Sequence, residues 1–149
     1  MIDIEAIRGR IPLRYPYLMV DRIVEESDDR IVALKNVTIN EPFFQGHFPE
    51  PLEAVMPGTL ILEAMAQTAA FLILLKDEAE PREGYLVGVE KARFRRKVVP
   101  GDQLRVEARR TRARRGLLQA DVDATVDGEL AASATISLLT TGGAAEGRS

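Results

Sequence analysis

A run of apolar residues from 60 to 75 constrains this chain more than any other feature, because only Glu63, Gln67 and Thr68 within it are polar. The other residues are Leu, Ile, Ala, Met and Phe, most of which favour an α-helix. A helix that is apolar on nearly every side is buried on nearly every side. The run is too short to span a bilayer, which takes about twenty residues. We therefore predict a buried central helix over residues 57–76.

The remaining sequence is typical of strands joined by turns. Apolar and polar residues alternate, and Asp127-Gly128 is a strong hairpin signal. We predict a short helix at 4–9 and six strands, at 18–26, 30–39, 85–98, 104–112, 118–126 and 130–139. An antiparallel sheet wrapped around the central helix satisfies this pattern, which makes the fold class α+β. So small a sheet cannot cover the whole helix, so we expect a dimer to complete the core.

We expect residues 1–141 to form one domain and residues 142–149 to be a disordered tail. The sequence contains no cysteine and a single histidine. Disulfides, cysteine nucleophiles and cysteine-based metal sites are therefore excluded, and one chain cannot form a histidine-cluster metal site. The acidic N-terminus lacks the features of a signal peptide, so we expect a cytoplasmic protein.

Basic residues are concentrated in one part of an otherwise acidic chain. Eleven Lys and Arg residues, against two acidic ones, lie between Lys91 and Arg115, while the whole chain carries a net charge of −3. These residues have three interpretations. The first is a solvent-facing strand surface, which the alternation at Arg105, Glu107 and Arg109 supports. A second interpretation, nucleic-acid binding, has no recognition motif to support it and is not expected. The third is docking of a strongly acidic partner protein, because charge steers such encounters.

Four residues near the central helix are candidates for chemistry. Glu63 and Gln67 lie four residues apart, so they share a helix face within hydrogen-bond distance. A carboxylate is rarely buried without a partner. His47 lies upstream, and Gly58 stands where the helix begins. Taken singly, each also fits a structural role: a core histidine, a satisfied buried polar group, or a glycine that opens a helix.

Several longer motifs are spread over residues 10–140: Arg14-Tyr15-Pro16 with Val20-Asp21-Arg22, the segment 36–49 that includes Gly46-His47-Phe48-Pro49, Met56-Pro57-Gly58, Glu63-Ala64-Met65-Ala66-Gln67, and Ala92-Arg93-Phe94-Arg95-Arg96 with Val98-Val99-Pro100-Gly101-Asp102. Together they resemble the 3-hydroxyacyl-[acyl-carrier-protein] dehydratases of bacterial type II fatty-acid synthesis (FabZ type). The resemblance implies a hotdog fold and a homodimer with two shared active sites, often assembled as a trimer of dimers. It also implies dehydration of (3R)-3-hydroxyacyl thioesters to trans-2-enoyl thioesters. It further implies a substrate carried on the phosphopantetheine arm of acyl carrier protein, and no cofactor or metal is expected.

The resemblance also assigns roles to individual residues. It makes His47 and Glu63 the catalytic pair, contributed by different subunits; a histidine suits the base, and a carboxyl on an apolar helix face suits the acid. The Gly58 N–H at the helix start would polarise the thioester carbonyl, and Gln67 would hold Glu63. Phe44 and Tyr85 are expected to form the wall or gate of the acyl tunnel, with a plain core position as the alternative. Arg93, Arg95, Arg96 and Lys97 are expected to form the surface that docks the carrier protein.

Two departures from the family pattern concern the site. Leu13 stands where the family usually has histidine, and the segment 50–55 is about two residues longer than usual. Two alternative functions stay open. One is a hotdog thioesterase, which would direct water at the thioester carbonyl, and the other is a non-catalytic hotdog protein that binds acyl chains or a partner.

Overall fold

The computed structural model describes residues 1–74, 83–114 and 116–141. The predicted tail at 142–149, the end of the central helix at 75–76 and most of the connection that follows it lie outside the described residues. The helices are α1 (Ile4–Arg10), the short 3-10 helix η1 (Pro42–Gln45) and α2 (Gly58–Leu74). The strands are β1 (Arg22–Glu26), β2 (Arg30–Asn36), β3 (Glu83–Phe94), β4 (Gln103–Arg114), β5 (Leu117–Val126) and β6 (Glu129–Thr141).

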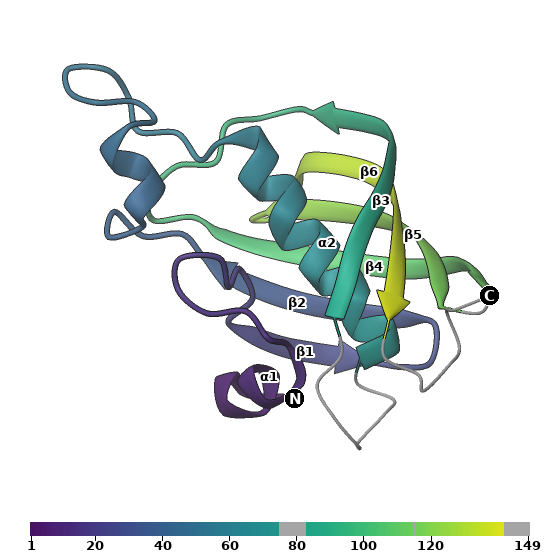
Figure 1. Ribbon diagram of the computed structural model, residues 1–149. Helices are drawn as coiled ribbons and strands as arrows, with labels where there is room; N and C mark the ends of the chain where they lie inside the picture. Colours follow the sequence, from purple (N-terminus) through teal and green to yellow (C-terminus); the bar gives the residue numbers. More distant parts are fainter. Residues whose placement is uncertain (75–82, 115, 142–149) are drawn as a thin grey trace.

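The strands form one antiparallel sheet in the order β1-β2-β4-β5-β6-β3. The hairpin between β5 and β6 turns at Asp127 and Gly128, whose φ angles are 50° and 81°. Two consecutive positive φ angles are what a tight two-residue hairpin requires, which is why Asp-Gly predicts it. The sheet curls around α2 (Figure 1), and this arrangement confirms the predicted α+β fold of six strands and one long helix.

The central helix is buried along its length, as its composition predicts. α2 packs against β2, β4, β5 and β6. Along β5 every second residue is buried, so one face of the strand belongs to the core and the other faces outward. Thr68 is fully buried, and its hydroxyl donates to the main-chain oxygen of Ala64. Within the described residues, no helix is long and apolar enough to cross a membrane.

The first strand begins four residues later than predicted, at Arg22 rather than residue 18. The reason is a side chain distant in sequence. The Met19 N–H donates to Gln67 Oε1 at 2.8 Å, and the Tyr17 carbonyl accepts from Gln67 Nε2 at 2.6 Å. The segment 17–19 therefore binds α2 instead of a neighbouring strand. Between β2 and α2 the chain also forms the short helix η1, which none of the sequence patterns above predicts.

Part of the basic block (residues 91–115) lies on the outer face of the sheet, where acidic side chains neutralise it. Arg109 contacts Glu107 and Asp123, and Glu107 also accepts from Nε of Arg30, a residue of β2 outside the block, at 2.5 Å. Burial alone would raise the pKa of Glu107, but the hydrogen bonds from Arg30 and Arg109 outweigh it and lower that pKa below its ordinary value. This part of the block therefore fits the interpretation as a solvated strand face.

An apolar strip at the β3 edge of the sheet is left exposed. Tyr85, Leu86 and Val87 are each at least half exposed, at 50%, 53% and 54%, and Leu139 of β6 is exposed beside them. Strand β3 is the last in the sheet and pairs only with β6 among the described strands. An edge strand with an apolar surface favours association with another chain.

Candidate active site

His47 directly follows η1 and Gly46, and main-chain hydrogen bonds fix its position. Its N–H donates to the Phe43 carbonyl at 3.0 Å, and its carbonyl accepts from the Val55 N–H at 3.2 Å. The His47 Nδ1 lies 2.7 Å from the Val55 oxygen. A carbonyl oxygen only accepts, so Nδ1 carries the proton, and in the neutral ring Nε2 is the free basic nitrogen. The imidazole is thereby oriented to accept a proton through Nε2.

His47 opens into a cavity of about 450 Å³ at the N-terminal end of α2. Gly58 lines the same cavity and is the first residue of α2. The first amides of a helix have no partner within the helix, and the helix dipole makes this end partly positive. Phe94 covers Gly58 so closely that a Cβ added to the glycine would lie 3.1 Å from its ring. The cavity thus combines a base with an amide suited to polarise a carbonyl oxygen.

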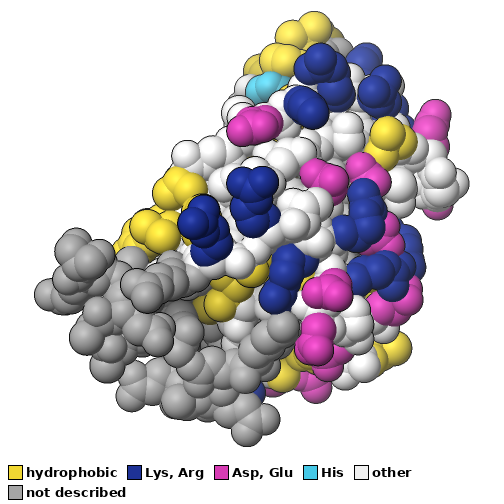
Figure 2. Space-filling model, turned by 90° about the vertical axis from the view of Figure 1, so that its right-hand side faces the viewer, with side chains coloured by type: hydrophobic (Ala, Val, Ile, Leu, Met, Phe, Trp, Pro, Cys, Tyr) yellow, Lys and Arg dark blue, Asp and Glu magenta, His cyan; other side chains and the backbone are white. Residues whose placement is uncertain are grey.

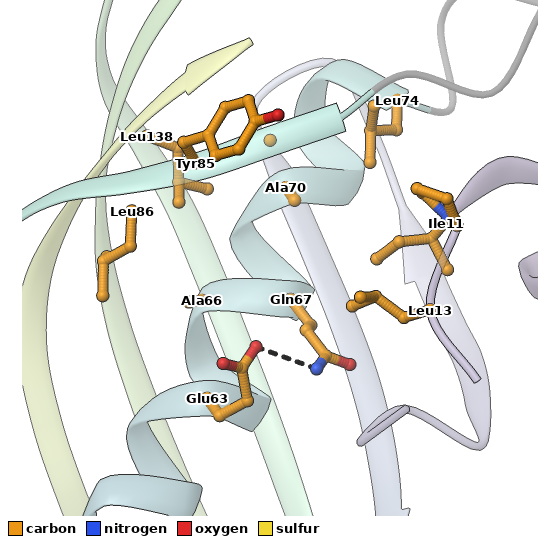
Figure 3. A pocket seen from close by; sticks show the side chains of 12 residues that line it. Ile11, Leu13, Glu63, Ala66, Gln67, Ala70, Leu74, Tyr85, Leu86 and Leu138 are labelled. Atoms are coloured by element: carbon orange, nitrogen blue, oxygen red, sulfur yellow. Dashed lines mark hydrogen bonds between the residues drawn. The ribbon is translucent and has the colours of Figure 1, made fainter. Parts of the chain in front are cut away.

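Glu63 lies on α2 and is half-buried. Its Oε2 accepts a hydrogen bond of 2.9 Å from Gln67 Nε2 (Figure 3). Gln67 is 3% exposed, and its amide is held at the other end because Oε1 accepts from Met19. Nε2 also donates to Tyr17, so the amide cannot flip without losing its bonds. The hydrogen bond predicted from the four-residue spacing is therefore present, and Gln67 fixes one oxygen of Glu63.

Glu63 and Gln67 line one part of a cavity of about 340 Å³ that follows α2 toward its C-terminal end. Figure 3 shows Ala66 and Ala70 along the helix, between residues of the N-terminal segment and of β3. The rest of the lining is mainly apolar and comes from four parts of the chain: Ile11, Pro12, Leu13, Leu74, Gly84, Tyr85, Leu86 and Leu138. A mainly apolar cavity that follows a helix and contains a carboxyl group suits a chain-like ligand with one reactive polar end.

The two cavities share no lining residue, so His47 and Glu63 of one chain do not meet in one cavity. Of the two predicted tunnel residues, Tyr85 lines the Glu63 cavity. Phe44 lines neither cavity: it is only 6% exposed and packs edge-on against Phe43, with the ring centroids 4.6 Å apart. In this chain Phe44 belongs to the core, and its role as a tunnel gate stays a prediction.

Three of the four predicted docking residues lie beside His47. Arg95, Arg96 and Lys97 line the His47 cavity, and Figure 2 shows the only histidine at the surface next to a group of Lys and Arg side chains. Lys97 pairs with Glu53 at 3.1 Å. Arg96 is held by Asp102 and Glu129 at 3.5 and 2.8 Å. Arg93 and Arg95 are exposed and form no ion pair with any other described residue.

Some groups around the candidate site could not be recognised in the sequence. The Val55 carbonyl and the main-chain groups of Tyr17 and Met19 orient the site, but main-chain atoms are present in every residue and leave no sequence signal. Phe94 lies within one of the family motifs, yet its contact with Gly58 depends on how β3 passes the start of α2. Among the described residues, no group of three or more His, Cys, Asp or Glu side chains could hold a metal ion.

Comparison with known proteins shows which protein family this chain resembles in sequence. A family model described as a FabA-like domain matches residues 11–135. The 3-hydroxyacyl-[acyl-carrier-protein] dehydratase FabZ of Streptococcus gordonii is 53% identical over 136 residues, which cover 91% of this chain and 96% of that protein. The protein of the same name in Streptococcus mutans is also 53% identical, with the same coverage.

Solved structures resemble the fold at low sequence identity. The dehydratase heterocomplex ApeI:P from Xenorhabdus doucetiae has a TM-score of 0.76 at 14% identity, covering 91% of each chain. A hypothetical thioesterase from Streptococcus pneumoniae has a TM-score of 0.62 at 16% identity, covering 81% of this chain and 85% of its own. These likenesses concern the fold, whereas the FabZ relatives match in sequence over nearly their whole length. The chain therefore belongs to the FabA-like family, and within it to the 3-hydroxyacyl-[acyl-carrier-protein] dehydratases of the FabZ type.

Proposed function

We propose that this protein dehydrates (3R)-3-hydroxyacyl-[acyl-carrier-protein] to the trans-2-enoyl thioester, with His47 of one protomer and Glu63 of its partner in each active site. The observation that carries the proposal is that one chain holds two oriented groups suited to acid–base chemistry, His47 and Glu63, in two separate cavities. A single chain would leave each group without its counterpart. Two chains that face each other can supply both.

The proposed reaction removes one proton and one hydroxyl group. His47 Nε2 takes the proton from C2, and the electrons of that C–H bond form the new double bond as the C3–O bond breaks. Glu63 protonates the departing oxygen, which leaves as water. The Gly58 N–H stabilises the negative charge that develops on the thioester oxygen. No electrons are gained or lost overall, so the proposal requires no redox cofactor.

The proposed catalytic unit is a homodimer formed through the β3 edge. The apolar strip of Tyr85, Leu86, Val87 and Leu139 would be buried in such a contact. An edge strand offers unpaired main-chain groups to the same strand of a second copy, which suits a two-fold interface. Association of three such dimers is the higher assembly that we propose to test by sedimentation.

The acyl group and its carrier would use the two cavities in different ways. The mainly apolar Glu63 cavity would take the acyl chain, with Tyr85 and Leu13 in its wall. The basic residues Arg93 and Arg95 would attract the acidic carrier protein to the entrance beside His47. We place this reaction in the cytoplasm, which fits a chain without cysteine.

A direct assay tests the proposal against the two alternatives. The purified protein is incubated with 3-hydroxybutyryl and crotonyl thioesters, and both the enoyl product and the free thiol are measured. Interconversion of the two thioesters is the expected result. Release of free thiol would indicate a thioesterase, and the absence of both products would indicate a binding protein.

A further inference from the structure

A lysine is buried on the inner face of the sheet, in a position that the proposed chemistry does not use. Lys35 alternates along β2 with Ile31 and Ala33, which both belong to the hydrophobic core. Lys35 itself is only 4% exposed. Removing a charged ammonium group from water is costly, so a lysine is rarely buried unless its charge is paired.

The charge of Lys35 is matched by two carboxylates from different segments. Its Nζ donates to Glu41 Oε1 at 2.7 Å, and Asp21 Oδ2 lies 4.0 Å away. Asp21 is itself held, because the same oxygen accepts the N–H of Asn36 at 2.7 Å. Lys35 is buried and Glu41 is partly buried, and an ion pair in such a position often adds no more stability than apolar residues of the same size would. Its value can instead lie in fixing the relative positions of the segments that it joins.

Glu41 connects this ion pair to His47 through the main-chain hydrogen bonds of η1. Glu41 immediately precedes η1, but its side chain does not cap that helix and reaches back to β2 instead. The Glu41 carbonyl accepts from the Phe44 N–H at 3.1 Å, and the Phe43 carbonyl accepts from the His47 N–H at 3.0 Å. A shift of Glu41 would therefore move η1 and, with it, His47.

Asp21 connects the same ion pair to Glu63 through the preceding segment and Gln67. Asp21 closely follows Tyr17 and Met19, whose main-chain groups hold Gln67. Gln67 in turn holds Glu63. Lys35 thus lies between the segment that supports one catalytic side chain and the segment that carries the other.

We propose that Lys35 is a positioning residue for the dehydration, and that its ion pair with Glu41 sets where η1 begins and where His47 lies. This inference rests on the proposed function, because it requires His47 to take part in the reaction. Lys35 touches no substrate: it acts through Glu41 and η1.

The decisive variant replaces both members of the pair, Lys35→Met with Glu41→Leu. Neither charge is then left buried without a partner, so the fold should keep its stability. With a small 3-hydroxyacyl thioester we expect kcat to fall at least about tenfold and KM to change less than about threefold. Thermal unfolding should change by no more than a few degrees. If the ion pair served stability alone, the double variant would keep the wild-type kcat as well as the wild-type stability.

A second measurement needs no substrate. His47 is the only histidine, so its ring protons give a single, unambiguous set of NMR resonances. We expect these resonances to shift in the double variant. The matched control is Arg30→Met, which removes another cation of β2 from an ion pair with Glu107 on the outer face. This control should keep both the wild-type kcat and the wild-type histidine resonances.

A folded double variant with wild-type kcat and unchanged histidine resonances would overturn the inference. If the double variant does not fold, Glu41→Ala decides, since Glu41 lies in a loop and Lys35 keeps Asp21 nearby. The same loss of kcat and the same shift of resonances are expected, and wild-type behaviour in both would overturn it. Failure of the proposed function is distinguishable, because the wild-type protein would then not dehydrate the thioester at all.

Discussion

The Nδ1 atom of His47 lies 2.7 Å from the main-chain oxygen of Val55, and this contact leaves Nε2 as the basic nitrogen of the only histidine in the chain. Replacement of the ring should therefore remove the base. We expect His47→Ala to lower kcat by at least about a hundredfold, the usual scale for a general acid or base. Circular dichroism and sedimentation should show a folded dimer. Near-wild-type dehydration by that folded variant would exclude His47 from the mechanism.

Glu63→Ala should be equally inactive, yet mixing the two inactive proteins should restore activity. If each site takes His47 from one protomer and Glu63 from the other, a mixed dimer has one intact site and one doubly defective site. Random exchange at equal amounts should recover about one quarter of the wild-type sites. Subunit exchange is verified with differently tagged chains. No recovery after complete exchange would indicate that each site is built within one chain.

Arg93 and Arg95, which form no ion pair with another described residue, should matter for the carrier protein and not for the chemistry. We expect Arg93→Glu with Arg95→Glu to lower kcat/KM for a carrier-linked substrate, while a small thioester is turned over normally. The difference in kcat/KM between the wild type and this double variant should also decrease with salt, because exposed charges are screened over about 8 Å at physiological ionic strength.

The matched control for this double reversal is Arg112→Glu with Arg114→Glu. These two exposed residues of β4 undergo the same change of charge but, unlike Arg95, do not line the His47 cavity. Equal losses in the two double variants would mean that net charge, and not a docking surface, governs the encounter. Equal losses on carrier-linked and small substrates would point to damage at the active site.

Ala70 should limit how long an acyl chain the protein accepts. It lies in the wall of the Glu63 cavity with a small side chain, and Leu74 lies one helical turn further along. Ala70→Leu would fill part of that space, so kcat/KM should fall by about tenfold or more for long acyl chains and much less for four-carbon substrates. Leu13→Ala, in the part of the wall formed by the N-terminal segment, enlarges the cavity and should not lower the rate for long chains. A uniform loss across all chain lengths in Ala70→Leu would contradict this assignment.

Glu107 should contribute stability that disappears in acid. Its pKa is lower in the folded protein than its ordinary value of 4.5. A carboxyl with a lowered pKa stabilises the fold above its unfolded-state pKa and loses this effect as the pH falls through its folded-state pKa. The free energy of unfolding should therefore differ between wild type and Glu107→Gln at neutral pH, and this difference should shrink below about pH 4.5. Denaturant titrations between pH 7 and 3 measure it, with Glu26→Gln of β1 as an exposed control.

The elements of the fold could be predicted because each depends on local pattern. The apolar run gives α2, alternation gives β4 and β5, and Asp127-Gly128 gives the last hairpin. The start of β1 could not be predicted, because Gln67 binds the segment 17–19 across a long separation in sequence. Lys35 was overlooked for the same reason: the pattern of β2 does not show that Glu41 folds back to meet it.

The candidate catalytic residues were found through motifs, whereas their arrangement required coordinates. The spacing of Glu63 and Gln67 on one helix predicts their hydrogen bond, since helix geometry alone brings them together. His47 and Glu63 are related only through the folded loop and, in our proposal, through a second chain. Phe44 shows that a position next to a motif does not reveal whether a side chain lines a cavity, because this aromatic residue lies in the core.

Tyr85 and Leu86 line the Glu63 cavity and are also half-exposed at the edge of the sheet, so one strand serves as a cavity wall and as the proposed subunit contact. Two binding events that share a strand are thermodynamically linked, and such linkage is reciprocal. An acyl ligand that orders β3 should strengthen subunit association by the same factor by which association strengthens ligand binding. Dilution would then weaken substrate affinity as well as separate the chains, and a saturating ligand would protect the assembly from dissociation.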